Sequence, residues 1–377
     1  MSNYGLPYKG SKNLIANYII DILPSENRLV DLFGGGGAIT HCAILSGKYK
    51  NFLYNEINPL LVDLFKKAID GYYNVNKFIP EFITREKFFE LKDKDGYVKY
   101  IWSFGHNGSD YLFGKDIEEF KKQSHNFIVF KDKEGLKYLE NHFKDSYYWH
   151  IKSILYEGSN YIDRRKAFVD ISLKIEAIRV TKLYSNRVYD LYKNLSYEEF
   201  RILKKCEVTR SINEFIPDIP KKNYKNSKLG RLKELKQLQQ LQQLQQLQQL
   251  ERLQQLERLQ QLEQLEQLEI TNDTYLNYNY SDGDIVYCDP PYENTSGYNE
   301  ESFNSKEFYN WIYNSDFPIF FSSYEISDNR FKNIGNRRKR NLNVGANTKN
   351  HNIEYLYCNN AGFNKIQRIK MVSKPLF

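Results

Sequence analysis

Cysteine is scarce in this chain of 377 residues, and its four copies lie far apart. They are Cys42, Cys206, Cys288 and Cys358, and no two of them have the spacing of a zinc site or a redox motif. The six histidines also lack the paired spacing that a metal site needs. We therefore expect a reduced protein of the cytoplasm, with no disulfide framework and no resident metal.

Long apolar runs are missing as well. The sequence has no stretch of about 18 or more apolar residues, and its first residues, MSNYGLPYKGSKN, lack the apolar core of a signal peptide. These absences predict a soluble, cytoplasmic protein without a membrane span. The formal net charge of +7 allows a polyanionic partner such as DNA but does not by itself demand one.

Strand and helix signals alternate near both ends of the chain. In the N-terminal part we expect a strand over 29–33, a four-glycine turn, a helix over 38–45, a strand over 52–54 and a helix from Pro59. In the C-terminal part we expect a strand over 284–288, a helix over 304–314, a strand over 318–325, a basic loop over 336–341 and a late strand over 354–360. This alternation is typical of a parallel α/β sheet.

The middle of the chain breaks this alternation. Residues 76–228 are rich in aromatic and charged residues, and they predict a mostly helical second domain. From Leu229 to Leu268 a leucine occupies every third position, with Gln, Glu, Arg and Lys between. A step of three residues turns an α-helix by about 300°, so the leucines drift around it and do not form a heptad seam. A leucine-rich solenoid would need a different spacing. We interpret this segment as a helical spacer without a catalytic role.

Together these patterns predict four parts. They are residues 1–75 as the N-terminal part of a catalytic domain, 76–228 as an inserted domain, 229–268 as the repeat spacer, and 269–377 as the C-terminal part of the catalytic domain.

Two features of the first part indicate a ligand site. Glycine-rich turns between a strand and a helix let a ligand approach the main chain, and an acid after the next strand, here Glu56, commonly accepts bonds from ribose hydroxyls. The dinucleotide motif G-x-G-x-x-G does not fit, because Thr40 stands where its third glycine would be. A plain tight turn and a solvated acid are the alternatives.

The motifs resemble those of one enzyme family. Phe33-Gly34-Gly35-Gly36-Gly37 fits the F-x-G-x-G motif of S-adenosylmethionine-dependent DNA amino-methyltransferases, and Asp289-Pro290-Pro291-Tyr292 fits their D-P-P-Y motif. The segment PYKGSKNLI and the order of the motifs are similar to the Dam-like DNA adenine methyltransferases. This resemblance implies a Rossmann-like methyltransferase fold, with a largely helical target-recognition domain inserted between the motifs.

The resemblance also implies roles for particular residues. The Asp289 side chain and the Pro290 carbonyl would accept the two hydrogens of the target amine, while Tyr292 would stack on a base swung out of the duplex. The residues implied at the S-adenosylmethionine site are Tyr8, Lys12, Asp31, Phe33, Gly35, Gly37, Glu56, Tyr275 and Asp289. Relatives usually carry an acid or serine before the aromatic residue at position 275, and here Thr274 departs from that pattern, with Asp273 as a possible substitute.

DNA contacts are implied for two further segments. The stretch WSFGHNGSDYLFG, residues 102–114, is similar to one that lines the target site in the family, so Asn107 and Tyr111 are candidate contacts; a structured glycine turn is the alternative. The basic segment 336–341 offers Arg337, Arg338 and Arg340 for phosphate contacts, unless it is only a solvated loop. Arg164, Arg165 and Lys166 have a weaker claim.

We therefore expect a site-specific DNA adenine methyltransferase that acts as a monomer on double-stranded DNA. A cognate restriction endonuclease would be a further partner in a restriction-modification setting. The alternatives are a methyltransferase that acts on the exocyclic amine of cytosine, and a DNA-binding relative without catalysis.

Overall fold

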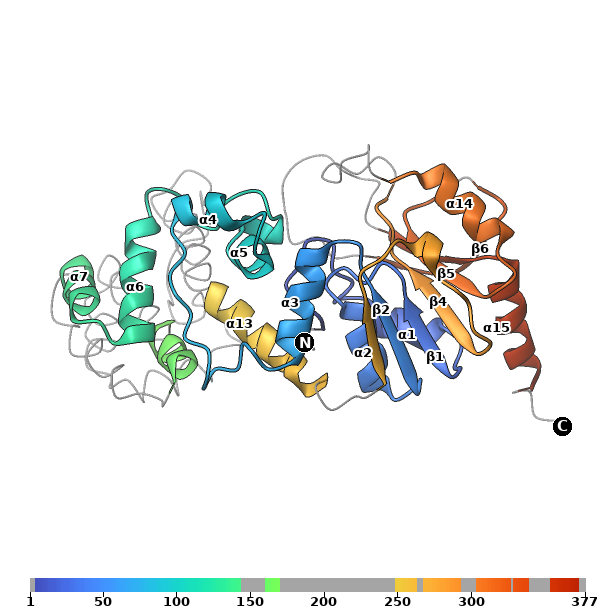
Figure 1. The fold of residues 1–377 in the computed structure, drawn as a ribbon, viewed down its shortest axis with the longest axis horizontal. Helices are drawn as coiled ribbons and strands as arrows, with labels where there is room; N and C mark the ends of the chain where they lie inside the picture. The colour runs from blue at the N-terminus through green and yellow to red at the C-terminus, as the bar shows by residue number, and fades with distance from the viewer. Residues whose placement is uncertain are drawn as a thin grey trace, which may run out of the picture. The chain divides into compact units, whose positions relative to one another are not determined.

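The computed structural model describes residues 4–143, 160–169, 248–262, 267–292, 303–326, 328–338 and 353–372 (Figure 1). The chain divides into two compact units. Unit 1 comprises Met1–Asn74, Arg85–Tyr111 and Gln255–Phe377, and unit 2 comprises Val75–Thr84 and Leu112–Gln254. Among the described residues, no helix combines the length and apolar character that crossing a membrane requires.

Unit 1 is built around one seven-stranded sheet with the order β3-β2-β1-β4-β5-β7-β6. Its strands are β1 (Arg28–Asp31), β2 (Asn51–Asn55), β3 (Leu268–Thr271), β4 (Asp284–Cys288), β5 (Ile319–Ser323), β6 (Lys332–Arg338) and β7 (Ile353–Cys358). The first five strands of the order run parallel, while β7 pairs antiparallel with both β5 and β6. The carboxyl ends of the parallel strands therefore share one edge with the amino end of β7.

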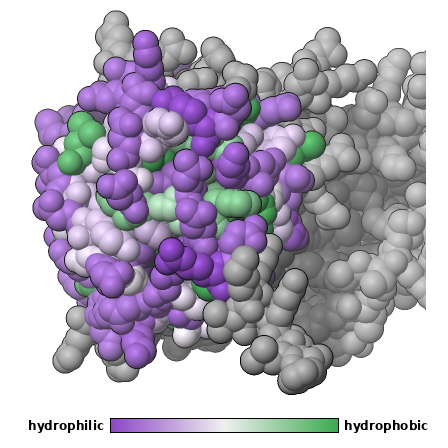
Figure 2. Space-filling model, turned by 90° about the vertical axis from the view of Figure 1, so that its right-hand side faces the viewer, coloured by the Kyte–Doolittle hydropathy of each residue, from purple (hydrophilic) through white to green (hydrophobic). Residues whose placement is uncertain are grey.

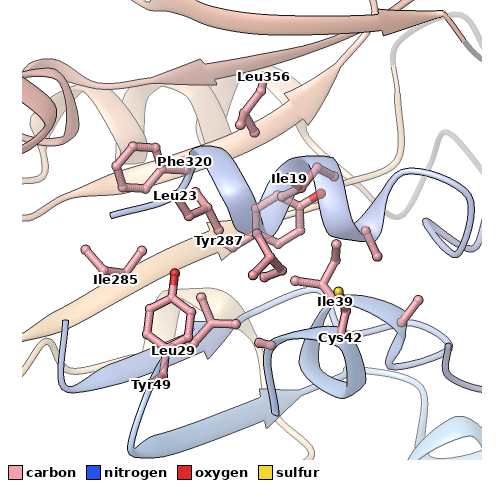
Figure 3. Packing of buried hydrophobic residues seen from close by; sticks show 14 of the residues in the cluster. Ile19, Leu23, Leu29, Ile39, Cys42, Tyr49, Ile285, Tyr287, Phe320 and Leu356 are labelled. Carbon is pink, nitrogen blue, oxygen red and sulfur yellow. The ribbon is translucent and has the colours of Figure 1, made fainter. Parts of the chain in front are cut away.

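Helices cover both faces of this sheet. Those of unit 1 include α1 (Ala16–Ile22), α2 (Ala38–Ser46), α3 (Pro59–Ile69), α4 (Arg85–Leu91), α5 (Gly96–Ile101), α14 (Ser305–Asn314) and α15 (Asn360–Val372). On one face α1 and α2 bury apolar side chains against the strands, as Ile19, Ile39 and Phe320 illustrate in Figure 3. On the other face, α14 packs Phe308 and Ile312 against the strands.

The register of β1 positions the motifs. Asp31 pairs with Tyr54 of β2 on one side and with Tyr287 of β4 on the other. Because both neighbours are parallel to β1, the glycine turn after β1 and the Asp-Pro-Pro-Tyr turn after β4 emerge side by side at the carboxyl edge. This is the place where α/β sheets bind their ligands.

The described part of unit 2 is helical, as the sequence predicts. It contains α6 (Glu118–Phe130), α7 (Lys133–Phe143) and a helix over 161–169. α6 and α7 pack together, and Gly135 permits their close approach because a Cβ there would lie 2.7 Å from the carbonyl oxygen of Gln123. Arg164 donates to the carbonyls of Ile128 and Val129, which lie in the last turn of α6.

The leucine repeat is helical over residues 248–262, and its last leucine, Leu268, begins β3. It forms α13 (Gln248–Leu259), followed by a 3₁₀ turn, η4 (Gln260–Leu262). Leu253, Leu256, Leu259 and Leu262 are all buried. Three successive leucines of such a repeat span about 120° of an α-helix, which is one broad apolar stripe. The 3₁₀ turn keeps the fourth on the same side, since residues three apart eclipse there.

The expected α/β architecture is confirmed, and a strand or helix is present wherever we expected one in unit 1. One segment that we expected to be a loop differs. This segment is the basic stretch 336–341. Residues 336–338 instead belong to β6, because antiparallel pairing with β7 satisfies their main chain, and 339–341 lie outside the described residues. The sequence patterns did not indicate α1, β3 or β6. The four-part functional division stays a prediction, since compactness does not say which residues read DNA.

Candidate active site

The segment before α1 lies directly on the glycine turn. The N–H of Leu6 donates to the carbonyl of Gly36 at 2.5 Å, and the N–H of Gly5 donates to Nδ1 of His41 at 3.0 Å. The ring of Tyr8 lies against Gly35, where a Cβ would be 3.3 Å from it. The N-terminal motif and the glycine motif thus form one packed unit.

The glycines are required by the protein's own packing. A Cβ on Gly34 would lie 2.3 Å from the ring of Tyr54, and one on Gly37 would lie 2.5 Å from the ring of Phe65. Gly37 also has a φ of +71°, a backbone conformation that favours glycine, at the residue before α2. These contacts fix the shape of the turn independently of any ligand.

Glu56 follows β2 and shapes the same turn. Its carboxylate accepts from the N–H of Gly35 at 2.8 Å and from the N–H of Asn58 at 2.9 Å. Burial raises the pKa of this carboxyl, and the main-chain N–H groups oppose that rise. The side chain stands at the expected place after β2, with one of its oxygens held by the glycine turn.

Asp31 at the end of β1 has an unsatisfied oxygen. Its Oδ2 accepts from the Thr40 hydroxyl at 2.9 Å. Its Oδ1 is buried and has no hydrogen-bond partner among the residues that the structure describes. Burial raises the pKa of this carboxyl to about 7, against the effect of Thr40. A buried acceptor without a donor is costly, so this position fits a ligand that brings its own donor, such as an ammonium group.

Phe33 and Tyr275, both expected at the donor site, lie together. Their ring centroids are 5.3 Å apart, and both rings also contact Phe308 of α14. A cavity of about 230 Å³ is lined by residues that include Leu32, Asn55 and Asp273, but neither ring is part of its lining. The main-chain carbonyl of Asp273 accepts from the Asn55 amide at 2.9 Å.

Asp289, directly after β4, is part of a cluster of charged groups. Nζ of Lys12 lies 2.6 Å from Oδ2 of Asp289, and the hydroxyl of Tyr292 lies 3.0 Å from Oδ1. The same Nζ is 4.9 Å from the centroid of the Tyr292 ring. The structure thus brings Lys12 to the Asp-Pro-Pro-Tyr turn. Its role toward a methyl donor stays a prediction.

Glu354 is a member of this cluster that the sequence patterns did not reveal. It lies in β7 with 3% of its surface exposed. Its carboxylate oxygen Oε1 is 3.1 Å from Nζ of Lys12 and accepts from the hydroxyl of Tyr292 at 2.7 Å. One signal could have found it, namely an acid inside the otherwise apolar strand IEYLYC.

Burial and charge act against each other in this cluster. Burial lowers the pKa of Lys12, but the carboxylates of Asp289 and Glu354 outweigh it, so its pKa is raised. Burial raises the pKa of Asp289, with Glu354 adding to the rise and Lys12 opposing it. Burial and both carboxylates raise the pKa of Tyr292, which remains a neutral donor.

The segment 102–114 forms a short loop closed by pairing of Ser103 with Tyr111. The Asn107 side chain accepts from the N–H groups of Ser109 and Asp110 and donates to the Asp110 carboxylate. The ring of Tyr111 is buried, with the Arg85 guanidinium 4.8 Å from its centroid. Both side chains shape the loop. Whether they also contact DNA is untested.

The basic residues of β6 lie in the strand at the edge of the sheet. They are not members of the charged cluster around Asp289. Arg337 is exposed, and its guanidinium lies 5.2 Å from the Tyr18 ring centroid. Arg338 ends β6, and Arg340 lies outside the described residues. Figure 2 shows the end of the molecule that lies on the right in Figure 1, where most of the coloured surface is hydrophilic. The DNA contacts expected of Arg337, Arg338 and Arg340 stay a prediction.

Within the described ranges, no group of three or more His, Cys, Asp or Glu side chains is arranged to hold a metal ion.

Comparison with known proteins finds a family model that matches the N-terminal part of the chain. Residues 8–168 match the model of the D12 class N6 adenine-specific DNA methyltransferases. No curated protein matches the chain. The matched segment contains Tyr8, Lys12, the glycine turn and Glu56, and it ends before the leucine repeat and Asp289. It favours adenine over cytosine as the target, and an enzyme over a DNA-binding relative without catalysis. Over residues 8–168 this chain carries a D12 class N6 adenine-specific DNA methyltransferase domain, and it is an enzyme that methylates adenine in DNA.

Proposed function

We propose that the chain transfers a methyl group from S-adenosylmethionine to the exocyclic amine of an adenine that is swung out of a short double-stranded DNA site. The observation that carries this proposal is the position of Asp289 at the carboxyl end of β4, next to the glycine turn after β1. The donor's turn and the acceptor's turn are thereby neighbours on one sheet edge.

Asp31, Phe33, Glu56 and Tyr275 would hold the donor. The unsatisfied Oδ1 of Asp31 suits the donor's ammonium group, and the Phe33 and Tyr275 rings offer apolar surface. Glu56 would accept from ribose hydroxyls with the carboxylate that already accepts from Gly35. Bound S-adenosylmethionine would supply the methyl group in activated form, as a sulfonium.

Asp289 and Pro290 would act on the target amine. The lone pair of an aromatic amine is delocalised into its ring, so the amine is a poor nucleophile. A carboxylate of Asp289 and the carbonyl of Pro290 that accept its two hydrogens would draw the lone pair out of the ring plane. The prolines fix both acceptors in advance, which avoids reorganisation during the reaction. Tyr292 would contact the swung-out base, since such enzymes extrude their target.

The enzyme would act in the cytoplasm as a monomer. In a restriction-modification setting, a cognate endonuclease would be a separate protein that cuts the same site when it is unmethylated.

Expression in a host without adenine methylation tests this function. We expect modification-sensitive sequencing of the host DNA to find N6-methyladenine at one short motif, and purified protein to bind S-adenosylmethionine. Asp289→Ala should abolish the mark and retain most donor binding. Methylated cytosine would overturn the choice of base, and DNA without any mark would overturn the activity. Near-normal turnover of Asp289→Ala would overturn the role of that residue.

A further inference from the structure

Glu354 reaches the active site because of the direction of its strand. β7 runs antiparallel to β5, with Tyr355 opposite Ser323, the last residue of β5. The amino end of β7 therefore lies at the carboxyl edge of the parallel strands, where Asp289 follows β4. This topology places a second buried carboxylate beside the one that the Asp-Pro-Pro-Tyr motif supplies.

Glu354 contacts two of the groups that also contact Asp289. Lys12 lies 2.6 Å from Asp289 and 3.1 Å from Glu354, so its ammonium bridges the two carboxylates. The Tyr292 hydroxyl carries one proton and lies 3.0 Å from Asp289 and 2.7 Å from Glu354. The shorter of these two distances is to Glu354. The Glu354 carboxylate thus shares both of the groups that would otherwise engage Asp289.

The charges of the cluster do not cancel. Among the residues that the structure describes here, two carboxylates face one ammonium and Tyr292 is neutral, so these four groups together carry one negative charge. Without Glu354, Lys12 and Asp289 would form a simple ion pair with both charges neutralised. Breaking a buried ion pair to receive a neutral amine would be costly, because the released charges lose their mutual compensation.

We propose that Glu354 is a positioning residue for methyl transfer, which shares Lys12 and holds the Tyr292 hydroxyl so that Asp289 keeps its carboxylate oxygen Oδ1 for the target amine. This inference rests on the function proposed above. Through Glu354, β7 would take part in methyl transfer, although it belongs to neither the glycine motif nor the Asp-Pro-Pro-Tyr motif.

The remaining negative charge also suits the reaction. As the bond from the amine nitrogen to the methyl carbon forms, the carbon–sulfur bond breaks and its electron pair stays on sulfur. The nitrogen becomes positively charged and then loses one of its two protons, which Asp289 can accept and pass to solvent. A cluster with a net negative charge stabilises that developing positive charge, whereas a neutral ion pair does so less well.

The test compares Glu354→Gln, Glu354→Asp and a control, Glu26→Gln, in the full-length chain. Glutamine keeps the size of Glu354 and removes its charge. Glu26 pairs with Lys365, so its substitution removes a carboxylate from an ion pair elsewhere in unit 1. For each variant we would measure single-turnover methylation of a DNA duplex that contains the motif found by sequencing the host DNA. S-adenosylmethionine binding and thermal unfolding are measured as well.

We expect Glu354→Gln to slow methyl transfer by about 10- to 100-fold, as displacement of a reacting group does. Donor binding should stay within about threefold of the wild type, since the inference places Glu354 at the amine and not at the donor. Glu354→Asp should recover part of the rate, and Glu26→Gln should match the wild type. A rate for Glu354→Gln within about twofold of the wild type would overturn the inference.

A pH profile separates this role from a structural one. Within the described part of the chain, the groups that face or act on Asp289 are Lys12 before α1, Asp31 of β1, Tyr287 and Cys288 of β4, Tyr292 of its own turn, Tyr324 after β5 and Glu354 of β7. Because the charge of Glu354 raises the pKa of Asp289, its removal should move the acidic limb of the rate profile to lower pH. An unchanged limb in an otherwise folded variant would contradict the inference.

A failure of the role proposed for Glu354 can be distinguished from a failure of the proposed function. If the wild type does not methylate adenine, the function itself fails. If the wild type is active and Asp289→Ala is inactive, but Glu354→Gln transfers methyl groups normally, only the role of Glu354 fails.

Discussion

The side-chain amide of Gln255 donates a hydrogen bond to the main-chain carbonyl of Gly5 at 2.9 Å. Gln255 belongs to the leucine repeat, and Gly5 belongs to the segment that lies on the glycine turn. A second repeat residue, Gln260, accepts from the side chain of Asn74 at 2.9 Å. The last part of the repeat is therefore built into the fold of unit 1, even though its composition is that of a spacer.

Leu259→Ala should destabilise the protein. The Leu259 side chain is fully buried, and truncation of a buried leucine costs about 2–5 kcal/mol, because it loses apolar burial and leaves a cavity. Urea unfolding should show this loss as a lower midpoint. The neighbouring Arg258 is exposed, so Arg258→Ala should stay within about 0.5 kcal/mol of the wild type. Equal stability of both variants would show that the repeat contributes no core.

Gly37→Ala should destabilise the protein more than Gly47→Ala. Both glycines have positive φ, +71° and +65°, so both substitutions carry a backbone cost of about 1–2 kcal/mol. Only at Gly37 would the new Cβ also collide with a ring, that of Phe65, at 2.5 Å; no atom lies within 4 Å of a Cβ at Gly47. Overpacking of this kind costs about 1–3 kcal/mol more. The difference between the two unfolding free energies measures this collision.

A result in which Gly47→Ala and Gly37→Ala lose the same stability would mean that Phe65 moves aside at no cost. The shape of the glycine turn would then be set by φ alone.

The sequence predicted the sheet and the neighbourhood of its two motifs for a physical reason. Strands that end in Asp31 and Cys288 are short apolar runs followed by glycine or proline, and both features are local. Once both strands are parallel members of one sheet, their carboxyl ends must share an edge. Glu56 could be placed by the same reasoning, because it directly follows a third such strand.

Glu354 could not be placed by local reasoning. Whether an acid in a strand is solvated or buried depends on what the strand pairs with, and β7 pairs with β5 and β6 across distant parts of the chain. The buried side of the leucine repeat escaped prediction for a similar reason. Its leucines visit several faces of a helix, so only the surrounding structure decides which of them are covered.

His41→Asn should reduce the sensitivity of stability to acid. Nδ1 of His41 accepts from Gly5, and burial lowers the pKa of His41 from its ordinary value of 6.5 to about 4. Between pH 6.5 and about 4, His41 is therefore protonated in the unfolded chain but not in the folded chain. The free energy of unfolding consequently decreases as the pH falls through this range. Asparagine keeps an acceptor and does not titrate. The unfolding free energy at neutral pH minus that in acid should be smaller in the variant, and an unchanged difference would contradict this.

Asp31→Asn should remove the pH dependence of donor binding. Burial raises the pKa of Asp31 to about 7, and the carboxylate form is the one that would attract an ammonium. Affinity for S-adenosylmethionine should therefore rise as the pH rises toward 7 and weaken below it, with a proton released on binding. Calorimetry in two buffers of different ionisation enthalpy measures that proton. The exposed Asp21 provides the control, Asp21→Asn. Proton release that persists in Asp31→Asn would refute this role.

Arg337→Gln should weaken DNA binding to all sequences alike. Arg337 is exposed on β6, and a phosphate contact by its guanidinium would add to affinity without reading bases. Removing one such contact should reduce the slope of log affinity against log salt by about 1. Lys67 is a half-buried cation of α3 that pairs with Asp63, so Lys67→Gln provides a control of equal charge change. If both variants keep the wild-type slope, β6 does not contact the DNA backbone through Arg337. A slope reduced equally in both would show that only net charge matters.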